Sequence, residues 1–183
     1  MDVSLFVKYA MSVTNLTFSA AADLFVISNR PGIVSGYSHV VFVPLALSIA
    51  QRDGVTLLTN QHIGVRVSKF DDAVVTGTAT AYDNVATAPA PLEVITSPSY
   101  YMEFDVMCGT LTTGATERKL LSDGWNVQAP YLYQWGPDER PVMNLLDDDA
   151  GAEDAFVVRL ENAPSTGIDI NATLLYGLLG PVG

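Results

Sequence analysis

The 183-residue chain is expected to fold as one all-β domain, a sandwich or barrel of about eight strands, and an eight-stranded jelly roll fits its length. Three observations predict this fold class. Short segments rich in β-branched and aromatic residues recur, turn-forming residues separate them, and no segment longer than about ten residues has the 3.6-residue period of an amphipathic helix. No linker or internal repeat divides the sequence, so residues 1–183 are expected to form a single domain with a loop-rich insertion at about 109–153.

The first half of the chain supplies most of the expected strands. Pro31-Gly32 is a turn signal, and Asp53-Gly54 is a residue pair typical of tight hairpins. Residues 40–50 form a continuous apolar run, which suits a strand that is buried on both faces or bent at its proline. The expected strands are residues 3–7, 13–18, 23–28, 40–50, 55–58, 62–67 and 73–80.

The second half is expected to contain more loops. Three prolines favour a loop at residues 86–98. Residues 100–108 alternate between apolar and polar side chains, which is typical of a half-buried strand and places Cys108 on its core side. The loop-rich insertion that follows is expected to hold one helical turn at Leu120-Leu121. The expected closing strands are residues 155–160 and 168–179.

The charge balance is the most unusual feature of the composition. Asp and Glu number 20 against 9 Lys and Arg, so the net charge is −11. An aspartate-rich, lysine-poor surface stays hydrated in concentrated salt, where a Debye length of about 3 Å or less screens its self-repulsion. High-salt adaptation is the favoured interpretation, and an ordinary acidic protein is the alternative. Without a basic run to displace phosphate counterions, direct binding of nucleic acid is not expected.

No residue pattern points to catalysis or to a cofactor. The two histidines, His39 and His62, stand in or beside expected strands, and no nucleophile elbow, phosphate-binding glycine loop or paired-histidine metal motif accompanies them. Glu103 and Asp105 share one strand face, but solvent-facing acids explain this pair better than glycosidase chemistry does. We therefore expect a protein that is not an enzyme.

An acidic stretch and a single cysteine are the remaining polar candidates. Asp147, Asp148 and Asp149 open the stretch 147–154, which is the best candidate for a calcium site. Consecutive carboxylates point in diverging directions, however, so a solvated loop without metal is favoured. Cys108 is the only cysteine, and it is either a small buried hydrophobic residue or a bridge to another chain.

Four aromatic residues cluster in the loop-rich insertion: Trp125, Tyr131, Tyr133 and Trp135. Such a cluster can stack on sugars, anchor a protein–protein contact or seal one end of the barrel, and the sequence leaves these roles open. Together with Cys108, these residues are the candidate interface.

Two further features concern processing and the membrane. The N-glycosylation pattern occurs at Asn15 and Asn171, in or near expected strands, and a chance match is favoured. The acid-bearing start does not look like a signal peptide, and the apolar run at 40–50 is shorter than the roughly 20 residues of a membrane span. We expect a soluble, cytoplasmically made protein.

Several features together carry a family resemblance: the immediate strand start at residues 1–7, the lysine-poor acidic composition and the Asp147-Asp148-Asp149 loop. They occur in an all-β chain with one cysteine and no basic arm. In size and character, over its whole length, the chain resembles the small major capsid protein of the icosahedral, internal-membrane viruses of haloarchaea.

The resemblance implies a single jelly-roll barrel that stands upright on the capsid surface of the virion, after assembly in the host cytoplasm. It implies packing with copies of itself and with a second, related, larger capsid protein into pseudo-hexameric capsomers. Penton or spike proteins are further implied partners. The capsid overlies a lipid membrane that encloses the DNA, so no direct contact with nucleic acid is implied. Cys108 is then a candidate for a bond to the partner capsid protein.

Two other classes of function remain open. A carbohydrate- or surface-binding β-sandwich module of a halophile predicts a monomer with an exposed platform at Trp125 and Trp135. A small hydrolase or isomerase of cupin-like fold needs a metal cluster of histidines and carboxylates, and only His39 and His62 are available for it.

Overall fold

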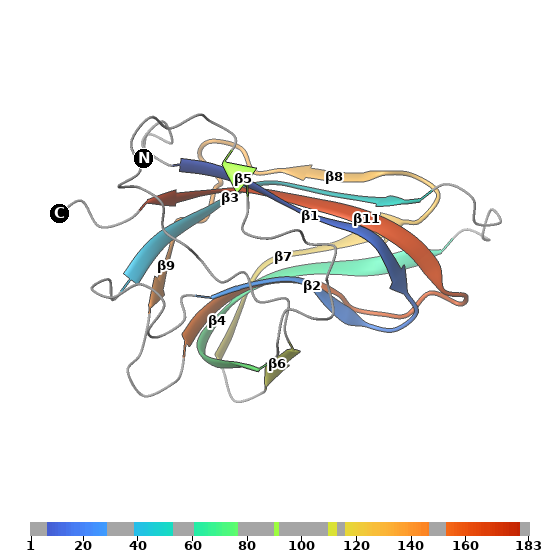
Figure 1. Ribbon diagram of the computed structural model, residues 1–183, viewed down its shortest axis with the longest axis horizontal. Helices are drawn as coiled ribbons and strands as arrows, with labels where there is room; N and C mark the ends of the chain where they lie inside the picture. The colour runs from blue at the N-terminus through green and yellow to red at the C-terminus, as the bar shows by residue number, and fades with distance from the viewer. Residues whose placement is uncertain are drawn as a thin grey trace.

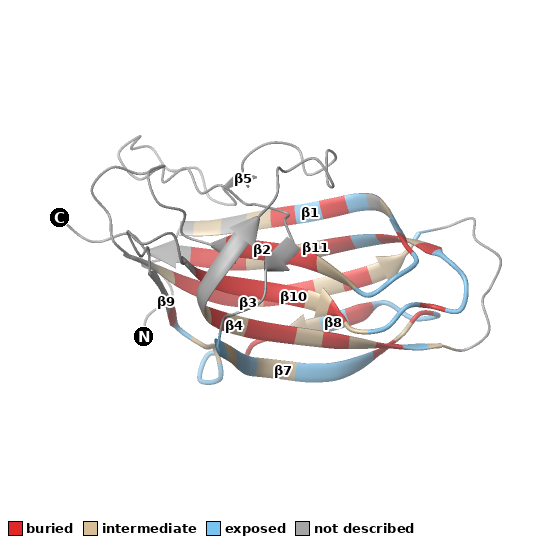
Figure 2. Ribbon diagram, turned by 90° about the horizontal axis from the view of Figure 1, so that it is seen from below, coloured by how far each residue is buried: buried red, intermediate tan, exposed pale blue. Residues whose placement is uncertain are grey.

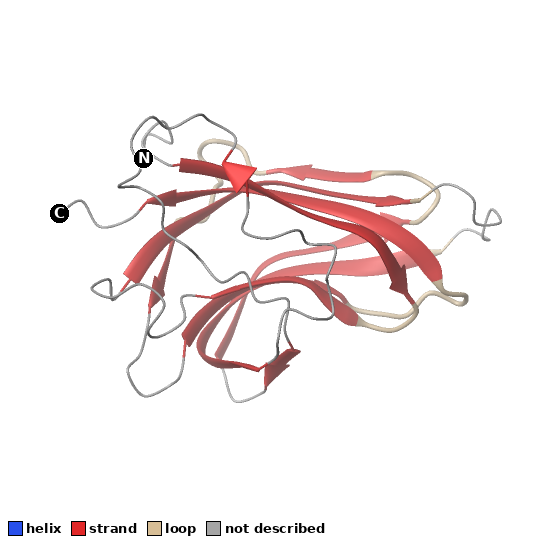
Figure 3. Ribbon diagram, in the orientation of Figure 1, coloured by secondary structure: helices blue, strands red, loops and turns tan. Residues whose placement is uncertain are grey.

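The computed structural model describes residues 7–28, 39–52, 61–76, 90–91, 110–112, 116–146 and 153–179. In these residues the protein is all-β, and two antiparallel sheets pack face to face (Figures 1 and 3). The predicted all-β sandwich is therefore confirmed. The described residues contain no helix that is long and apolar enough to cross a membrane.

The first sheet has the order β5-β1-β11-β3-β8, and β9 extends it by pairing with the other end of β3 (Figure 1). Its central strands β1, β11 and β3 are long, whereas the edge beside β3 is made of two short strands in succession. The strands are β1 (Val7–Phe18), β3 (His39–Gln51), β5 (Ala90–Pro91), β8 (Tyr131–Gln134), β9 (Met143–Leu146) and β11 (Ile168–Leu179).

The second sheet has the order β2-β10-β4, and both β6 and β7 pair with the far side of β4. Most of β7 is exposed, as expected for a strand at a sheet edge (Figure 2). The strands are β2 (Ala22–Ser28), β4 (His62–Thr76), β6 (Thr110–Thr112), β7 (Thr116–Asn126) and β10 (Glu153–Leu160).

The pairings between the strands other than β5 and β6 are nested along the chain. The first pairs with the last (β1 with β11), the second with the second from the end (β2 with β10), the third with β8 and β9, and β4 with β7. Two further pairings, β11 with β3 and β10 with β4, join these ladders into two sheets. The described strands are thus arranged like one long folded hairpin that has been rolled into a sandwich.

The core fills the space between the sheets with aliphatic and aromatic side chains. The Phe42 ring lies at its centre, with its centroid 4.7 Å from that of Phe156 and 5.3 Å from that of Tyr176. Each of these side chains is fully buried, which stabilises the fold by roughly 1.5–3 kcal/mol apiece. Every second residue of β11 contributes to this core: Ile168, Ile170, Ala172, Leu174 and Tyr176.

The sequence-based prediction is least accurate in residues 109–153, which were expected to be mainly loop. Residues 116–126 and 131–134 are strands β7 and β8, and Leu120-Leu121 belongs to β7 rather than to a helical turn. The reason is that β7 lies at a sheet edge, so charged and polar residues occupy it without the alternation of a buried strand. The expected strands at 55–58 and 100–108, residues 3–6 of the expected strand 3–7 and residues 77–80 of the expected strand 73–80 lie outside the described residues.

Candidate interaction surfaces

The aromatic cluster belongs to the core of the domain. Trp125, Tyr131 and Trp135 are only 1%, 8% and 4% exposed, so they present almost no surface to a sugar or a partner. Tyr133 is half-buried and packs edge-on against Trp135, with 5.0 Å between the ring centroids. These positions contradict the exposed Trp125/Trp135 platform that a carbohydrate- or surface-binding module predicts. Of the three roles that the sequence leaves open, burial favours sealing of the sandwich.

The polar atoms of this cluster are satisfied within the domain. The Trp125 indole N–H donates to the backbone carbonyl of Ala129 at 2.8 Å, and the Tyr131 hydroxyl donates to the Asp123 carboxylate at 3.2 Å. Burial, together with the negative charge of Asp123 and this hydrogen bond, raises the pKa of Tyr131 well above its usual range. Tyr131 is therefore a neutral donor that joins β8 to β7.

The other predicted candidates are divided between the described residues and the remainder. Cys108, Asp147, Asp148, Asp149, Glu103 and Asp105 lie outside the described residues. His39 begins β3, and His62 is an exposed residue at the start of β4. Within the described ranges, no three His, Cys, Asp or Glu side chains come together as a metal site.

Asp154 corrects the prediction for the acidic stretch. The sequence predicts a solvated loop here, but Asp154 is the second residue of β10 and is 6% exposed. The Lys69 ammonium lies 2.9 Å from the Asp154 carboxylate and 2.7 Å from that of Asp71, whose other oxygen pairs with Arg118 at 2.7 Å. Burial alone lowers the pKa of Lys69, but the two carboxylates outweigh it and the pKa is raised. This ionic cluster joins β4 to β10 and β7.

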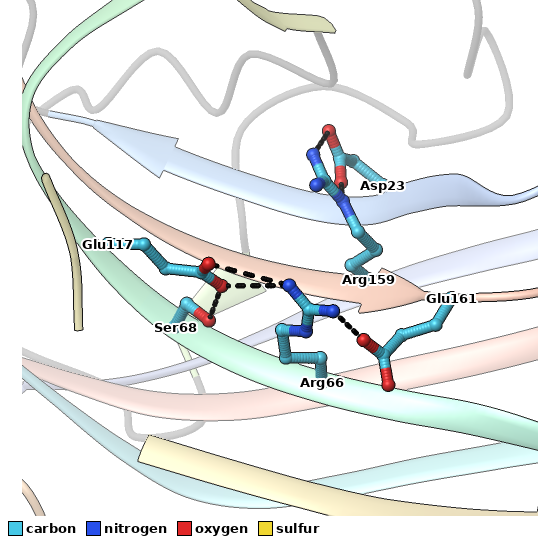
Figure 4. A network of polar contacts seen from close by, with 6 residues as sticks. All are labelled: Asp23, Arg66, Ser68, Glu117, Arg159 and Glu161. Atoms are coloured by element: carbon cyan, nitrogen blue, oxygen red, sulfur yellow. Dashed lines mark hydrogen bonds and ion pairs between the residues drawn. The ribbon is translucent and has the colours of Figure 1, made fainter. Parts of the chain in front are cut away.

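The outer face of the second sheet carries a charged network (Figure 4). Arg159 binds Asp23 through two parallel hydrogen bonds of 2.5 and 3.0 Å, which raise the pKa of the Arg159 guanidinium. Arg66 lies beside Arg159 in the strand register and pairs with Glu117 on one side and Glu161 on the other. Two arginines on the neighbouring strands β10 and β4 are thus flanked by carboxylates from β2 and β7 and by Glu161.

Glu117 makes part of this network sensitive to acid. Although burial works to raise its pKa, hydrogen bonds from Ser68 at 2.7 Å and from Arg66 lower it below the ordinary value of 4.5. A carboxyl group whose pKa is lower in the folded state stabilises the fold at pH values well above 4.5, and this contribution is lost as the pH falls through the folded-state pKa.

We therefore expect Glu117→Gln to lower the free energy of unfolding at neutral pH. The loss should be only about 0.5–1 kcal/mol, because the Arg66–Glu117 ion pair is partly exposed to solvent. The difference from the wild type should disappear at pH values below the folded-state pKa of Glu117. Urea unfolding at constant salt over a series of pH values measures this. A difference that is the same at every pH would show that Glu117 acts through its shape and not its charge.

The outer face of the first sheet is uncharged over its central part. The strand register aligns two neutral rows across four strands, one from β1 to β8 through Ser12, Thr173, Ser48 and Leu132. The Ser12 and Thr173 hydroxyls lie 2.9 Å apart and hydrogen-bond. Leu132 is 66% exposed and is one of the two large exposed hydrophobic residues of the described chain. The second row consists of Ala10, Leu175, Ala46 and Gln134.

We call the two rows the neutral face. Sequence reasoning missed this face because its residues are neither aromatic nor charged and stand in four separate segments. The alternation within β1 was a usable signal, since Ser12 and Thr14 alternate there with the core residues Met11 and Val13.

In comparisons with known proteins, no family model, curated protein or solved structure matches the chain.

Proposed function

We propose that this protein is a structural subunit of a viral capsid, a single jelly roll that packs side by side with other subunits in concentrated salt. The observation that carries the proposal is the order of the strands. With β5 and β6 left out and the others numbered along the chain as β1, β2, β3, β4, β7, β8 with β9, β10 and β11, the strands run 1-8-3-6 in one sheet and 2-7-4-5 in the other. This order supports a jelly roll, a fold used by capsid proteins, lectins and cupins.

Side-chain positions favour the capsid over the other two uses. A lectin-like module needs aromatic rings on its surface, whereas Trp125 and Trp135 are in the core. A cupin-like enzyme needs polar ligands inside the barrel, whereas Phe42, Phe156 and Tyr176 fill the space between the sheets. A packing subunit needs neither feature.

The charge distribution also supports assembly in high salt. With a net charge of −11, copies of the chain repel one another at low ionic strength. At multimolar salt the Debye length is about 3 Å or less, so acidic subunits can approach to contact. In the proposed virion, the chain and a related, larger capsid protein build pseudo-hexameric capsomers above an internal membrane, without contact with the genome.

Lowering the salt concentration is expected to dissociate the assembly before the sandwich unfolds. The reason is that long-range repulsion acts between whole subunits, while the apolar core is held by contacts within each one. Sedimentation velocity and far-ultraviolet circular dichroism, measured on the same samples across a salt titration, test this order. Loss of assembly and of strand signal at the same salt concentration would contradict the proposal.

A further inference from the structure

The second sheet has buried side chains on its outer face as well as on its core face. Phe156 and Val158 of β10 belong to the core cluster, so Val157 between them points away from the first sheet. Val157 is nevertheless only 1% exposed, and so is Val26, its partner on β2. Strand neighbours alone leave the outer side of such residues open to water, so a further part of the chain covers them.

The buried outer positions form a continuous patch across three strands. In the register, Val157 stands between Val26 and Ser68, and Ala155 stands beside Phe70. All five residues are buried, and we call them the outer patch. None of them belongs to the core cluster, because the second sheet itself lies between the outer patch and the core.

The end of β4 bends toward the outer patch. The register between β10 and β4 shifts after Phe70, so that Asp71 and Asp72 together stand opposite Asp154. Such a β-bulge bends the strand that contains it. Beyond the bulge, residues 74–76 pair with β6. Figure 1 shows this end of β4 curving below the second sheet, with β6 on the side that faces away from the first sheet.

The position of β6 shows how far the chain folds back. In the strand order β2-β10-β4-β6, β6 stands three places from β2, which corresponds to roughly 14 Å in a flat sheet. Cα atoms of β2 and β6 nevertheless approach to within 8 Å. The core fills the space on the inner side, so β6 reaches β2 across the outer face of β10. This path leads over the outer patch.

From these observations we infer that residues 74–76 of β4 and residues 110–112 of β6 form a strap, which closes over the outer patch and opens without unfolding of the sandwich. The inference concerns the single chain and goes beyond the proposed function. Opening of the strap uncovers an apolar surface at one defined place while the core stays closed.

The attachment of the strap explains why it opens separately. Three register pairs join β6 to β4, and β6 pairs with no other strand among the described residues. On the sandwich side of the bend, Asp71 is fixed by Lys69 and Arg118, each at 2.7 Å. The strap is therefore held by the bulge and by its contact with the outer patch. Segments with so few contacts open locally, at a lower free energy than global unfolding.

Two neighbouring valines provide a matched test in a Cys108→Ser background. Val157→Cys places a thiol under the strap, and Val158→Cys makes the same substitution on the core side. Ser122→Cys is the exposed control. We expect dithionitrobenzoate to label Val157→Cys at least about tenfold faster than Val158→Cys, and more slowly than Ser122→Cys. Its labelling rate should rise little with urea, whereas that of Val158→Cys should rise steeply because global unfolding is required.

The measurement is made at a salt and protein concentration where the chain is dispersed, so that only contacts within one chain protect the thiols. Urea unfolding of each variant corrects for differences in global stability. Labelling at Val157→Cys as fast as at Ser122→Cys would show that nothing covers the outer patch. The same rate and urea dependence at Val157→Cys and Val158→Cys would show that the strap does not open separately. Either result would overturn the inference and leave the proposed function standing.

A proline in β6 tests whether this strand is the cover. Leu111 pairs with Val75, and Leu111→Pro disturbs the short ladder between β6 and β4. It is expected to speed the labelling of Val157→Cys about tenfold and to leave that of Val158→Cys unchanged. An unchanged rate at Val157→Cys would mean that another part of the chain covers the outer patch. Equal acceleration at both positions would mean that β6 unfolds only with the core, and either outcome would overturn the inference.

Discussion

Replacing Trp125 by alanine is expected to lower the free energy of unfolding by about 3–5 kcal/mol, because it removes the largest fully buried side chain of the core. The indole is 1% exposed, and its N–H is bonded to the Ala129 carbonyl. Truncation therefore leaves a large cavity where β7 meets β8 and removes a buried hydrogen bond. Urea unfolding followed by circular dichroism, at a salt and protein concentration where the chain is dispersed, measures the change.

The control for this prediction is Leu132→Ala. Leu132 is 66% exposed, so its truncation should change the free energy of unfolding by less than about 0.5 kcal/mol. The two variants separate a core role from an interface role. If Trp125→Ala weakened association while the free energy of unfolding stayed near the wild-type value, the aromatic cluster would be a contact surface and the core assignment would be wrong.

The second large effect is expected at the ionic cluster of Lys69. Replacing Lys69 by methionine leaves the Asp154 carboxylate, only 7% exposed, without its cation at 2.9 Å. Removing one partner of a largely buried pair typically costs about 3–5 kcal/mol. Because Lys69 is 16% exposed and Arg118 still pairs with Asp71, we expect about 2–4 kcal/mol, measured by urea unfolding at neutral pH.

A double-mutant cycle provides the control for the ionic cluster. Adding Asp154→Asn to Lys69→Met removes the uncompensated charge, so the double variant should be more stable than Lys69→Met alone. If the two substitutions simply added, Lys69 and Asp154 would not interact, and the junction between β4 and β10 would depend on packing alone.

The sequence predicts strands well where alternation and core position coincide. Residues 168–179 are correctly predicted because the core takes every second side chain of β11, from Ile168 to Tyr176. The apolar run at 40–50 matches β3, which is central in its sheet and therefore covered on both edges. In these strands the apolar positions of the local sequence pattern are the positions that the folded protein buries.

Other strands depend on contacts that no local pattern reveals. The sequence predicts two strands at 62–67 and 73–80, whereas β4 runs without a break from His62 to Thr76. Its charged middle is stable in a strand because Lys69 and Asp71 meet Asp154 and Arg118 from other segments. Edge strand β7 escapes prediction for the related reason that solvent, rather than a core, surrounds most of its side chains.

The candidate surfaces are less predictable than the fold. Aromatic residues in a predicted loop suggest a protein–protein or sugar contact, but Trp125 and Trp135 are buried in the core, where their large apolar rings fill space between the sheets. The neutral face becomes visible only when the register brings residues such as Ser12, Ser48 and Thr173 into one row. A surface built from small neutral residues has no sequence motif. It is distinguished only by its lack of charge in a protein whose net charge is −11.

The most direct test of the central claim, that this chain is a subunit of an assembly, is its molar mass in concentrated salt as a function of protein concentration. Sedimentation equilibrium with and without reductant separates non-covalent association from any bridge through Cys108. We predict a mass that rises with protein concentration above the 19.6 kDa of the single chain, with reductant present. A mass of 19.6 kDa at every concentration would contradict the account.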